Sequence, residues 1–230
     1  MSTSYPFKPI VRDGLVFYLD AANDKSYTGT GTNWNDLTSS GSNGSLTNGP
    51  TFDSNNGGSI VFDGVNDYVN VPSNTYIAIT GDMTMCAWVY VNSLSGYNSI
   101  VGKTTGGGLP NPYDIYTNPS SGTVVFLRGN GSVYANTVSN TGLTINTWQH
   151  VAVTMTSTTA KHYLNGQPDG SGTISTSIGD GGGDLRVGSR DDLVTKMNGR
   201  ISSVMMYKRG LTDSEILKNY YATKKRYGLW

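Results

Sequence analysis

Apolar and polar residues alternate along most of this 230-residue chain. In DMTMCAWVYV (82–91), alternation with a period of two sets one face of a β-strand against the other. The residues on one face of this segment are Met83, Met85, Ala87, Val89 and Val91. Other segments of this kind, separated by clusters of Gly, Asn, Pro and Asp, predict strands at 14–20, 59–71 (two strands around an Asp-Gly turn), 97–102, 113–117, 122–128, 132–138, 147–156, 159–164, 184–188 and 198–207. So many half-buried strands indicate an all-β protein of two packed antiparallel sheets.

One segment near the C-terminus has a helical pattern instead. LTDSEILKNYYATKKRYG (211–228) places Glu215 three residues after Thr212, which is the spacing of a capping box. Apolar residues then recur at helical intervals, and Gly228 follows as a stop. The sequence therefore predicts one short helix at about 212–226, and it assigns the only glutamate of the chain to the helix cap.

Two segments, 28–58 and 103–112, are rich in Gly, Ser, Thr and Asn. The first still carries apolar residues at intervals that suit short edge strands, which predicts an ordered part of the same domain. These residues are Trp34, Leu37, Leu46 and Phe52. We find no internal repeat and no domain boundary, so we expect an N-terminal arm at 1–12 and one domain at 13–230.

Charge is sparse, with 14% charged residues and a formal net charge of zero. This balance does not suit binding to nucleic acid or to a membrane surface. The chain has no apolar stretch long enough to span a membrane, and its first residues lack the pattern of a signal peptide. We therefore expect synthesis in a cytoplasm. Cys86 stands inside an apolar run, which predicts a small buried side chain and not a reactive thiol.

Several segments together resemble the laminin-G-like, or concanavalin-A-like, lectin and glucanase jelly-roll domain. They are GLVFYLDAAN, TNWNDLTSSGSNGSL, SIVFDGVNDYVNV, MTMCAWVYV, WQHVAVTM, HYLNG, LRVGSRDD and NGRISSVMMYKRGLTDSEI, in the order expected for that family and over about residues 13–222. Similar domains occur in structural proteins of tailed phages, in bacterial surface proteins and as carbohydrate-binding modules. The resemblance implies a two-sheet jelly roll, often a glycan-binding or adhesive role, and sometimes a bound Ca²⁺. Many members carry Asp-Glu where this chain has Ser202 and Ser203, so a role of that acidic pair is missing or relocated here.

Hydrolysis of carbohydrates on this fold needs a pair of carboxyl groups that face one cleft. The chain has Glu215 at a helix start, and the adjacent Asp191 and Asp192 would point to opposite faces of a strand. We therefore predict that the protein is not an enzyme.

The two histidines, His150 and His162, fall on or near predicted strands. His150 lies on the face opposite to Val151 and Val153, and neither a nucleophile elbow nor zinc-ligand spacing accompanies it. We interpret both histidines as scaffold residues, with a chemical role as the alternative.

Oxygen ligands suited to Ca²⁺ are abundant in the predicted loops. The favoured candidates are Asp63, Asn66 and Asp67, because one short loop brings them together. The alternative is that such residues form Asx-turns and end strands. Further candidate sets are Asp20 with Asp24, and Asp180, Asp184, Asp191 and Asp192.

Glycan sites combine aromatic surfaces with amide and carboxylate groups. GGGLPNPYDIYTNP (106–119) supplies such groups beside flexible glycines, and Trp34 with Asn35 offers another surface. The alternative for all of them is ordinary packing of the sandwich. The candidate glycan-binding residues are Tyr113, Asp114, Tyr116, Asn118 and Trp34.

Two hypotheses for function follow. The first is a virion structural or accessory protein of a tailed phage, as a capsid decoration, neck or tail component. Its expected partners are other virion proteins and host glycans. We expect a homo-oligomer, because virion sites are symmetric. The second is a soluble carbohydrate-binding module. MSTSYPFKPI at the N-terminus and KKRYGLW at the C-terminus are candidate docking arms, with packing across the sandwich as the alternative.

Overall fold

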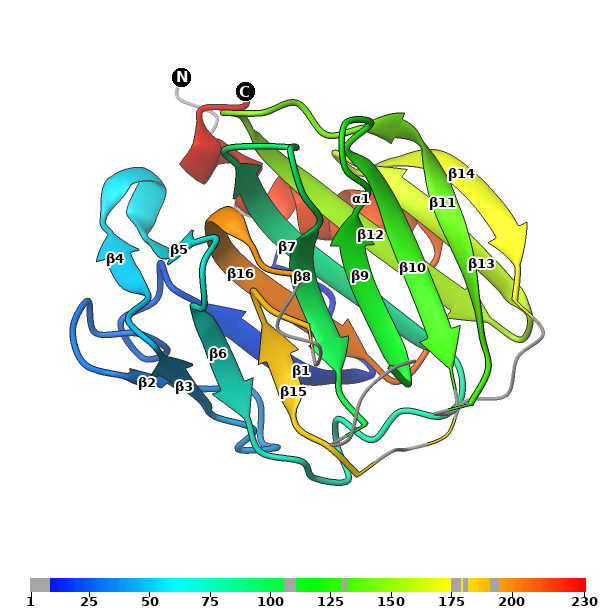
Figure 1. Ribbon diagram of the computed structural model, residues 1–230, viewed down its shortest axis with the longest axis horizontal. Helices are drawn as coiled ribbons and strands as arrows, with labels where there is room; N and C mark the ends of the chain where they lie inside the picture. The colour runs from blue at the N-terminus through cyan, green and yellow to red at the C-terminus, as the bar shows by residue number, and fades with distance from the viewer. Residues whose placement is uncertain (1–8, 106–110, 130–131, 175–178, 180–181, 191–194) are drawn as a thin grey trace, which may run out of the picture.

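Two antiparallel sheets, each of eight strands in the described part of the chain, pack face to face in the computed structural model (Figure 1). The structure describes residues 9–105, 111–129, 132–174, 179, 182–190 and 195–230. This arrangement confirms the predicted all-β sandwich with jelly-roll character. We call the sheet nearer the viewer in Figure 1 the front sheet and the other the back sheet.

Strand order in both sheets differs from sequence order. The front sheet runs β11 (Tyr134–Gly142), β10 (Thr123–Gly129), β9 (Tyr113–Thr117), β8 (Asn98–Lys103), β15 (Leu185–Val187), β6 (Tyr68–Val71), β3 (Gly44–Thr47) and β2 (Asn33–Trp34). The back sheet runs β14 (Gln167–Thr173), β13 (Thr159–Leu164), β12 (Trp148–Thr156), β7 (Met83–Val91), β16 (Asn198–Tyr207), β5 (Ser59–Asp63) and β4 (Thr51–Asp53), and β1 (Leu15–Asp20) pairs with β16. Strands far apart in sequence therefore pair in the middle of both sheets, where β15 lies between β6 and β8 and β16 lies between β5 and β7.

The main hydrophobic core fills the space between the sheets. The predicted inward residues of β7 all belong to it, and so do Val151, Val153 and Met155 of β12. Val151 pairs with Ala87 across the two strands, so both strands turn the same face inward. The period-two pattern thus located the buried face of these strands correctly.

The opposite face of the back sheet is covered by helix α1 (Asp213–Thr223), which continues into the short helix η2 (Lys224–Tyr227). Cys86 lies under α1 in a second hydrophobic cluster and is 1% exposed, as predicted. Burial raises the pKa of its thiol to about 12. Among the described residues, no helix has the length and apolar character needed to cross a membrane.

The start of α1 has the predicted capping box. Thr212 Oγ1 accepts from the Glu215 amide at 3.3 Å, and Glu215 Oε2 accepts from the Thr212 amide at 2.9 Å. Glu215 also binds Arg209 Nη2 through Oε1 at 2.6 Å, and these donors lower the pKa of the Glu215 carboxyl to about 2. The helix assembly ends at Gly228, whose φ of 72° is left-handed.

The described part of the N-terminal arm packs against the molecule. Ile10 and Val11 are buried in the cluster beneath α1. The Val11 amide donates to Asn219 Oδ1 at 2.8 Å, and its carbonyl accepts from Tyr207 Oη at 3.0 Å. Residues 1–8 of the predicted arm lie outside the described residues.

Three features differ from or extend the predicted pattern. The two strands in 59–71 form as β5 and β6, but they belong to different sheets, so the turn between them crosses the edge of the sandwich. Asn165 and Gly166 take the positive φ angles of a tight turn, 52° and 78°, and lead into β14, a strand that the alternation did not predict. Ser202, where family members carry an acid, donates to the Gly58 carbonyl at 2.7 Å.

Candidate functional site

A small polar pocket lies at one end of the sandwich, where loops from both sheets meet. The turn between β5 and β6, the loop between β7 and β8, and the residues that lead into β16 lie side by side there (Figure 1). The pocket has a volume of about 150 Å³. We call it the polar pocket, and its lining residues are Gly64, Ser93, Ser95, Gly96, Tyr97, Asn98, Lys196 and Asn198.

Asn98 holds the pocket together from beneath. Its side chain is buried, and its amide nitrogen donates to the Ser93 carbonyl at 2.9 Å and lies 3.3 Å from Thr117 Oγ1. Its Oδ1 accepts from the Asn198 amide at 2.9 Å. One asparagine therefore fixes the β7–β8 loop to the start of β16.

The β5–β6 turn closes directly over Asn198. Gly64 has a φ of 77°, and a Cβ at this position would lie 2.9 Å from the Asn198 Cβ. Asn198 also pairs with Asp63 across β16 and β5. Because both the conformation and the close approach require glycine, the wall of the pocket is set by the backbone.

Tyr97 forms the aromatic rim of the pocket. Its side chain is 46% exposed, and its ring meets the Tyr116 ring edge-on at a centroid distance of 5.8 Å. Tyr116 lies on β9, on the outer face of the front sheet with Val125 and Leu127. The contact positions Tyr97 while leaving much of its ring accessible to a ligand.

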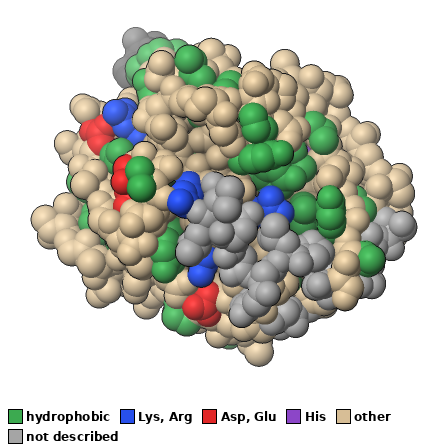
Figure 2. Space-filling model, in the orientation of Figure 1, with side chains coloured by type: hydrophobic (Ala, Val, Ile, Leu, Met, Phe, Trp, Pro, Cys, Tyr) green, Lys and Arg blue, Asp and Glu red, His purple; other side chains and the backbone are tan. Residues whose placement is uncertain are grey.

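Arg190 packs against the Tyr116 ring of this aromatic pair and forms an ion pair with Asp114. The Arg190 guanidinium lies 4.9 Å from the Tyr116 ring centroid, and Arg190 Nε contacts Asp114 Oδ2 at 3.0 Å. Burial raises the pKa of the Tyr116 phenol to about 12, so this ring is neutral at physiological pH. Figure 2 shows this face of the molecule, with Lys and Arg side chains near its middle beside a hydrophobic patch.

Lys196 is joined to the same cluster through the backbone. Ser189 and Lys196 form an isolated β-bridge, and the Arg190 amide donates to the Thr195 carbonyl at 3.0 Å. The bridge brings the Lys196 of the polar pocket and the Arg190 beside Tyr116 onto one short segment. The polar pocket therefore offers amides, hydroxyls, an ammonium group and an aromatic face.

The structure separates the predicted glycan-binding residues into two groups. Tyr116 contacts the Tyr97 of the polar pocket, whereas Asp114 is fully buried in its pair with Arg190. Tyr113 faces the core and donates to the Ile77 carbonyl at 2.5 Å, and Asn118 Nδ2 lies 3.1 Å from Thr123 Oγ1 in the β9–β10 turn. Trp34 is fully buried in the core, which corrects the predicted surface at that residue because no face of the indole is open to a ligand. Residues 106–110 of the same predicted segment lie outside the described residues.

The predicted calcium ligands lie one turn away from the polar pocket. Asp63 Oδ1 accepts from the amides of Val65 and Asn66 at 2.7 and 3.3 Å, and Asp67 Oδ2 accepts from the Asp63 amide at 3.1 Å. Burial raises the pKa of the Asp67 carboxyl. These bonds are those of the Asx-turn alternative, and they occupy one oxygen of each carboxylate.

A calcium ion at Asp63, Asn66 and Asp67 stays a prediction. If calcium binds there, the melting temperature of the protein rises in CaCl₂ and falls in EDTA, because the ion stabilises the folded state. Scanning calorimetry measures both temperatures. Equal melting temperatures in CaCl₂ and EDTA would contradict the calcium site.

The carboxylates of the other candidate calcium sets bind protein groups or lie outside the described residues. Asp20 pairs with Arg226 at 2.8 Å, and Asp184 accepts from Asn70 Nδ2 at 2.8 Å and from the Ser73 amide at 3.0 Å. Asp180, Asp191 and Asp192 lie outside the described residues. Within the part of the chain that is described, no three His, Cys, Asp or Glu side chains gather in a way that could hold a metal ion.

Both histidines are buried in the back sheet. His150 packs against Trp88 and Tyr220 at ring-centroid distances of 5.4 and 6.0 Å, and burial lowers its pKa to about 3. His162 Nε2 lies 2.8 Å from Thr137 Oγ1, and burial lowers its pKa to about 4. Both side chains are at most 1% exposed, which agrees with their interpretation as scaffold residues.

Tyr97, Lys196 and Asn198 were not predicted as site residues from the sequence. Tyr97 is the single aromatic residue in SLSGYNS (93–99), where its neighbours are small or polar apart from Leu94. That pattern suggests an exposed ring, but the similar pattern around Trp34 belongs to a buried one, so the signal alone does not find the site.

Comparisons with solved structures agree on this fold. The binding domain of Paraclostridial Mosquitocidal Protein 1 has a TM-score of 0.68 at 18% identity, over 90% of this chain and 52% of that one. Trypanosoma rangeli sialidase in complex with sialic acid has a TM-score of 0.68 at 18% identity, over 97% of this chain and 36% of that one. The chain thus spans about half of the first protein and about a third of the second.

Domain 4 of AbnA, an extracellular arabinanase from Geobacillus stearothermophilus solved with arabinotriose, is matched over its whole length. Its TM-score is 0.70 at 16% identity, over 91% of this chain and 100% of that one. No curated protein matches the chain by sequence. The family model described as the concanavalin A-like lectin/glucanases superfamily matches residues 63–217, which is more than half of the chain. The chain therefore belongs to the concanavalin A-like lectin/glucanases superfamily.

Proposed function

We propose that this protein is a non-catalytic carbohydrate-binding module that holds one sugar unit in the polar pocket against Tyr97. The observation that carries the proposal is the half-exposed Tyr97 ring at the mouth of a pocket whose other walls are amides, hydroxyls and an ammonium group. A sugar presents C–H groups on one face and hydroxyls around its edge. Such a ligand matches an aromatic face combined with polar groups that both donate and accept.

The size of the pocket supports a small ligand. Its volume of about 150 Å³ is below the range of about 300–1,000 Å³ that encloses drug-sized molecules. We infer that a single terminal or branch sugar enters it while the remainder of the glycan stays outside. Tyr116 supports the Tyr97 ring from behind and is itself 8% exposed, so Tyr97 provides the aromatic contact.

We propose no catalytic role because the glutamate and the two histidines, which could act as acids or bases, are held in other contacts or buried. Glu215, the only glutamate, is held by the helix cap and by Arg209. His150 and His162 have pKa values lowered by burial, and neither side chain reaches solvent. The relatives that bear on binding are the toxin binding domain and the arabinanase domain with arabinotriose, and their names are consistent with the proposal.

A glycan array with the labelled chain, followed by an NMR titration, tests the proposal. We expect at least one glycan to bind and to shift the amide signals of Ser95, Tyr97 and Asn198. An array without binding, or shifts that map away from the polar pocket, would contradict it.

A role as a virion accessory component of a tailed phage stays a prediction from the sequence resemblance. It is compatible with glycan binding, because such a component could use the same pocket on a host surface. Mass spectrometry of purified virions and native mass spectrometry of the chain test the location and the homo-oligomer. A chain that is missing from the particles would contradict the virion role.

A further inference from the structure

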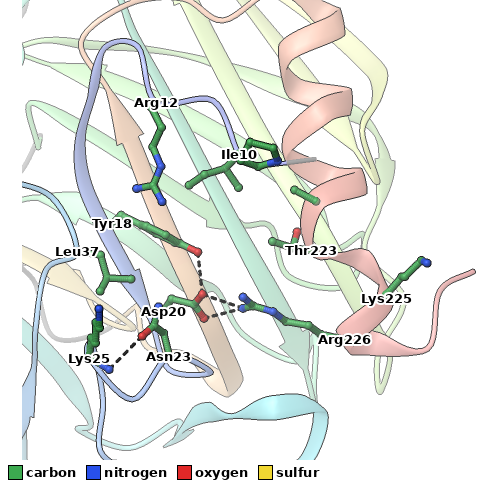
Figure 3. A pocket seen from close by; sticks show the side chains of 12 residues that line it. Ile10, Arg12, Tyr18, Asp20, Asn23, Lys25, Leu37, Thr223, Lys225 and Arg226 are labelled. Atoms are coloured by element: carbon green, nitrogen blue, oxygen red, sulfur yellow. Dashed lines mark hydrogen bonds and ion pairs between the residues drawn. The ribbon is translucent and has the colours of Figure 1, made fainter. Parts of the chain in front are cut away.

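A second, larger groove lies on the other side of the molecule, next to the helix that covers the back sheet. It has a volume of about 680 Å³ and runs between the N-terminal segment, β1 with the loop that follows it, and the end of α1 with η2 (Figure 3). This volume is in the range of sites for small organic ligands. We call it the basic groove; no residue lines both it and the polar pocket.

The charged residues that line the groove are mostly cationic. They comprise four cations, Arg12, Lys25, Lys225 and Arg226, and one carboxylate, Asp20. Figure 3 shows Arg12 and Lys25 extending toward Tyr18 from two sides, whereas Lys225 points away from Asp20. Lys225 Nζ lies 5.5 Å from the Trp230 ring centroid, so its charge is directed elsewhere.

Asp20, the one carboxylate among the described lining residues, is neutralised inside the wall. The Asp20 side chain is 1% exposed, and both of its oxygens lie 2.8 Å from Arg226 Nη1. Tyr18 Oη donates to Asp20 Oδ2 at 2.7 Å, and the Ala22 amide donates to Oδ1 at 3.1 Å. Burial raises the pKa of the Tyr18 phenol well above its ordinary value, so Tyr18 contributes a neutral hydroxyl.

The cations of Arg12 and Lys25 are left without a carboxylate partner among the described residues. Within that part of the chain, neither side chain makes a hydrogen bond or an ion pair. Nearby Asp36 is engaged by the Tyr18 amide at 2.9 Å and by Thr38 Oγ1 at 2.7 Å. Two exposed, unmatched cations beside a one-third-exposed Arg226 give the groove a positive potential.

The walls of the groove add an apolar part. Ile10 is buried in the cluster beneath α1, and Leu37 packs partly buried against the same cluster on the opposite wall. A ligand in the groove would therefore contact both hydrocarbon and exposed guanidinium or ammonium groups. Guanidinium groups bind carboxylates and phosphates in two-point fashion, which suits an oxyanion.

From this arrangement we infer that the basic groove binds a small organic oxyanion, with its carboxylate or phosphate group held by the cations Arg12 and Lys25 that line the groove and its uncharged part against Ile10 and Leu37. The inference goes beyond the proposed function, because it concerns a second site with different residues and a charged ligand. A glycan that carries an acidic sugar and a free small anion share the charged group, and the probes below distinguish them.

NMR titration of the full chain at constant ionic strength tests the inference. The probes are sodium glucuronate, inorganic phosphate and, as the uncharged counterpart of the first, glucose. We expect saturable shifts at Tyr18, Lys25 and Arg226 with at least one of the two anions and none with glucose. Binding of glucuronate alone identifies the acidic sugar as the ligand, and binding of phosphate alone identifies the phosphate group.

Charge-matched variants complete the experiment. Arg12→Gln combined with Lys25→Gln removes the two exposed cations, and we expect it to weaken anion binding at least tenfold. Lys161→Gln combined with Lys218→Gln removes the same charge outside the groove, and we expect it to leave binding within twofold. The inference is overturned by shifts that do not saturate with either anion, or by equal weakening in the two double variants. The amide spectrum of each variant reports that it is folded.

Discussion

His150 is a titratable side chain enclosed by aromatic rings. Trp88 on the neighbouring strand and Tyr220 on α1 pack against its imidazole, and no part of the side chain is exposed. A charged imidazole in this setting would lose its hydration without gaining a carboxylate, so burial favours the neutral form. The residue therefore makes stability depend on pH.

We predict that His150 reduces stability as pH falls below its ordinary pKa of 6.5. Its pKa in the folded protein is about 3, so between these values the unfolded chain binds the additional proton. From pH 7 to pH 5 this linkage costs about 2 kcal/mol. Urea unfolding at both pH values should show that His150→Phe loses less stability than the wild type over this interval. Equal losses in both proteins would contradict the prediction.

Trp34 and Tyr97 show what sequence can and cannot predict about a binding site. Both are single aromatic residues among Gly, Ser, Thr and Asn, and both therefore suggest an exposed ring. Trp34 is fully buried and Tyr97 is 46% exposed. The difference arises from packing against strands distant in sequence, which local composition does not encode.

At the scale of elements, the start of α1 is the feature most completely encoded by local sequence. Thr212 and Glu215 exchange hydrogen bonds as their spacing predicts, because both partners lie within one turn. Arg209, which binds the same glutamate, comes from the loop before the helix. It adds an ion pair that the motif alone did not indicate.

We predict that Thr212→Ala lowers the free energy of unfolding by about 1 kcal/mol, because the Glu215 amide loses its acceptor. Thr212→Ser keeps the hydroxyl and should stay within about 0.5 kcal/mol of the wild type. Urea denaturation followed by circular dichroism measures both variants. If both lose the same stability, the hydroxyl is not the group that caps the helix.

The hydrophobic pattern predicted strand β12 but not strand β14. The sequence of β12 alternates between core residues and residues under the helix, so its boundaries were predicted to within a residue. β14, QPDGSGT, has no apolar side chain except a proline and is held by main-chain pairing with β13. Backbone pairing leaves no trace in hydrophobic pattern, which is why this strand was not predicted.

At the scale of the whole molecule, the C-terminal segment ties the helix to the back sheet. Tyr227 stacks on Trp88 at 4.0 Å and lies 4.9 Å from Trp148. The adjacent Arg226 reaches Asp20 on β1, near the other end of the chain. One short helix thereby joins three strands that are far apart in sequence.

We predict that Tyr227→Ala destabilises the protein by about 3 kcal/mol and shifts tryptophan emission to longer wavelength, because it opens a cavity beside Trp88 and Trp148. Trp230→Ala is the matched control at the same end of the chain. Trp230 is 86% exposed, so its removal should change stability by less than about 0.5 kcal/mol. Urea unfolding monitored by fluorescence compares them, and similar losses in both variants would contradict the account of the C-terminal segment.

The sandwich itself was predictable, whereas its connections were not. Alternation defines which face of a strand is buried, and so β5 and β6 were both predicted. Their placement in different sheets depends on how the chain crosses the edge at Gly64. The polar pocket forms at that crossing, and this is why its residues come from three separate parts of the sequence.

The most direct test of glycan binding in the polar pocket is a calorimetric titration of wild type, Tyr97→Ala and Tyr76→Ala with a glycan selected on the array. Tyr76 is 44% exposed, close to the 46% of Tyr97, and does not line the pocket. We predict that Tyr97→Ala weakens binding at least tenfold, about 1.4 kcal/mol or more, and that Tyr76→Ala binds like the wild type. Equal affinities of all three proteins would contradict the proposed function.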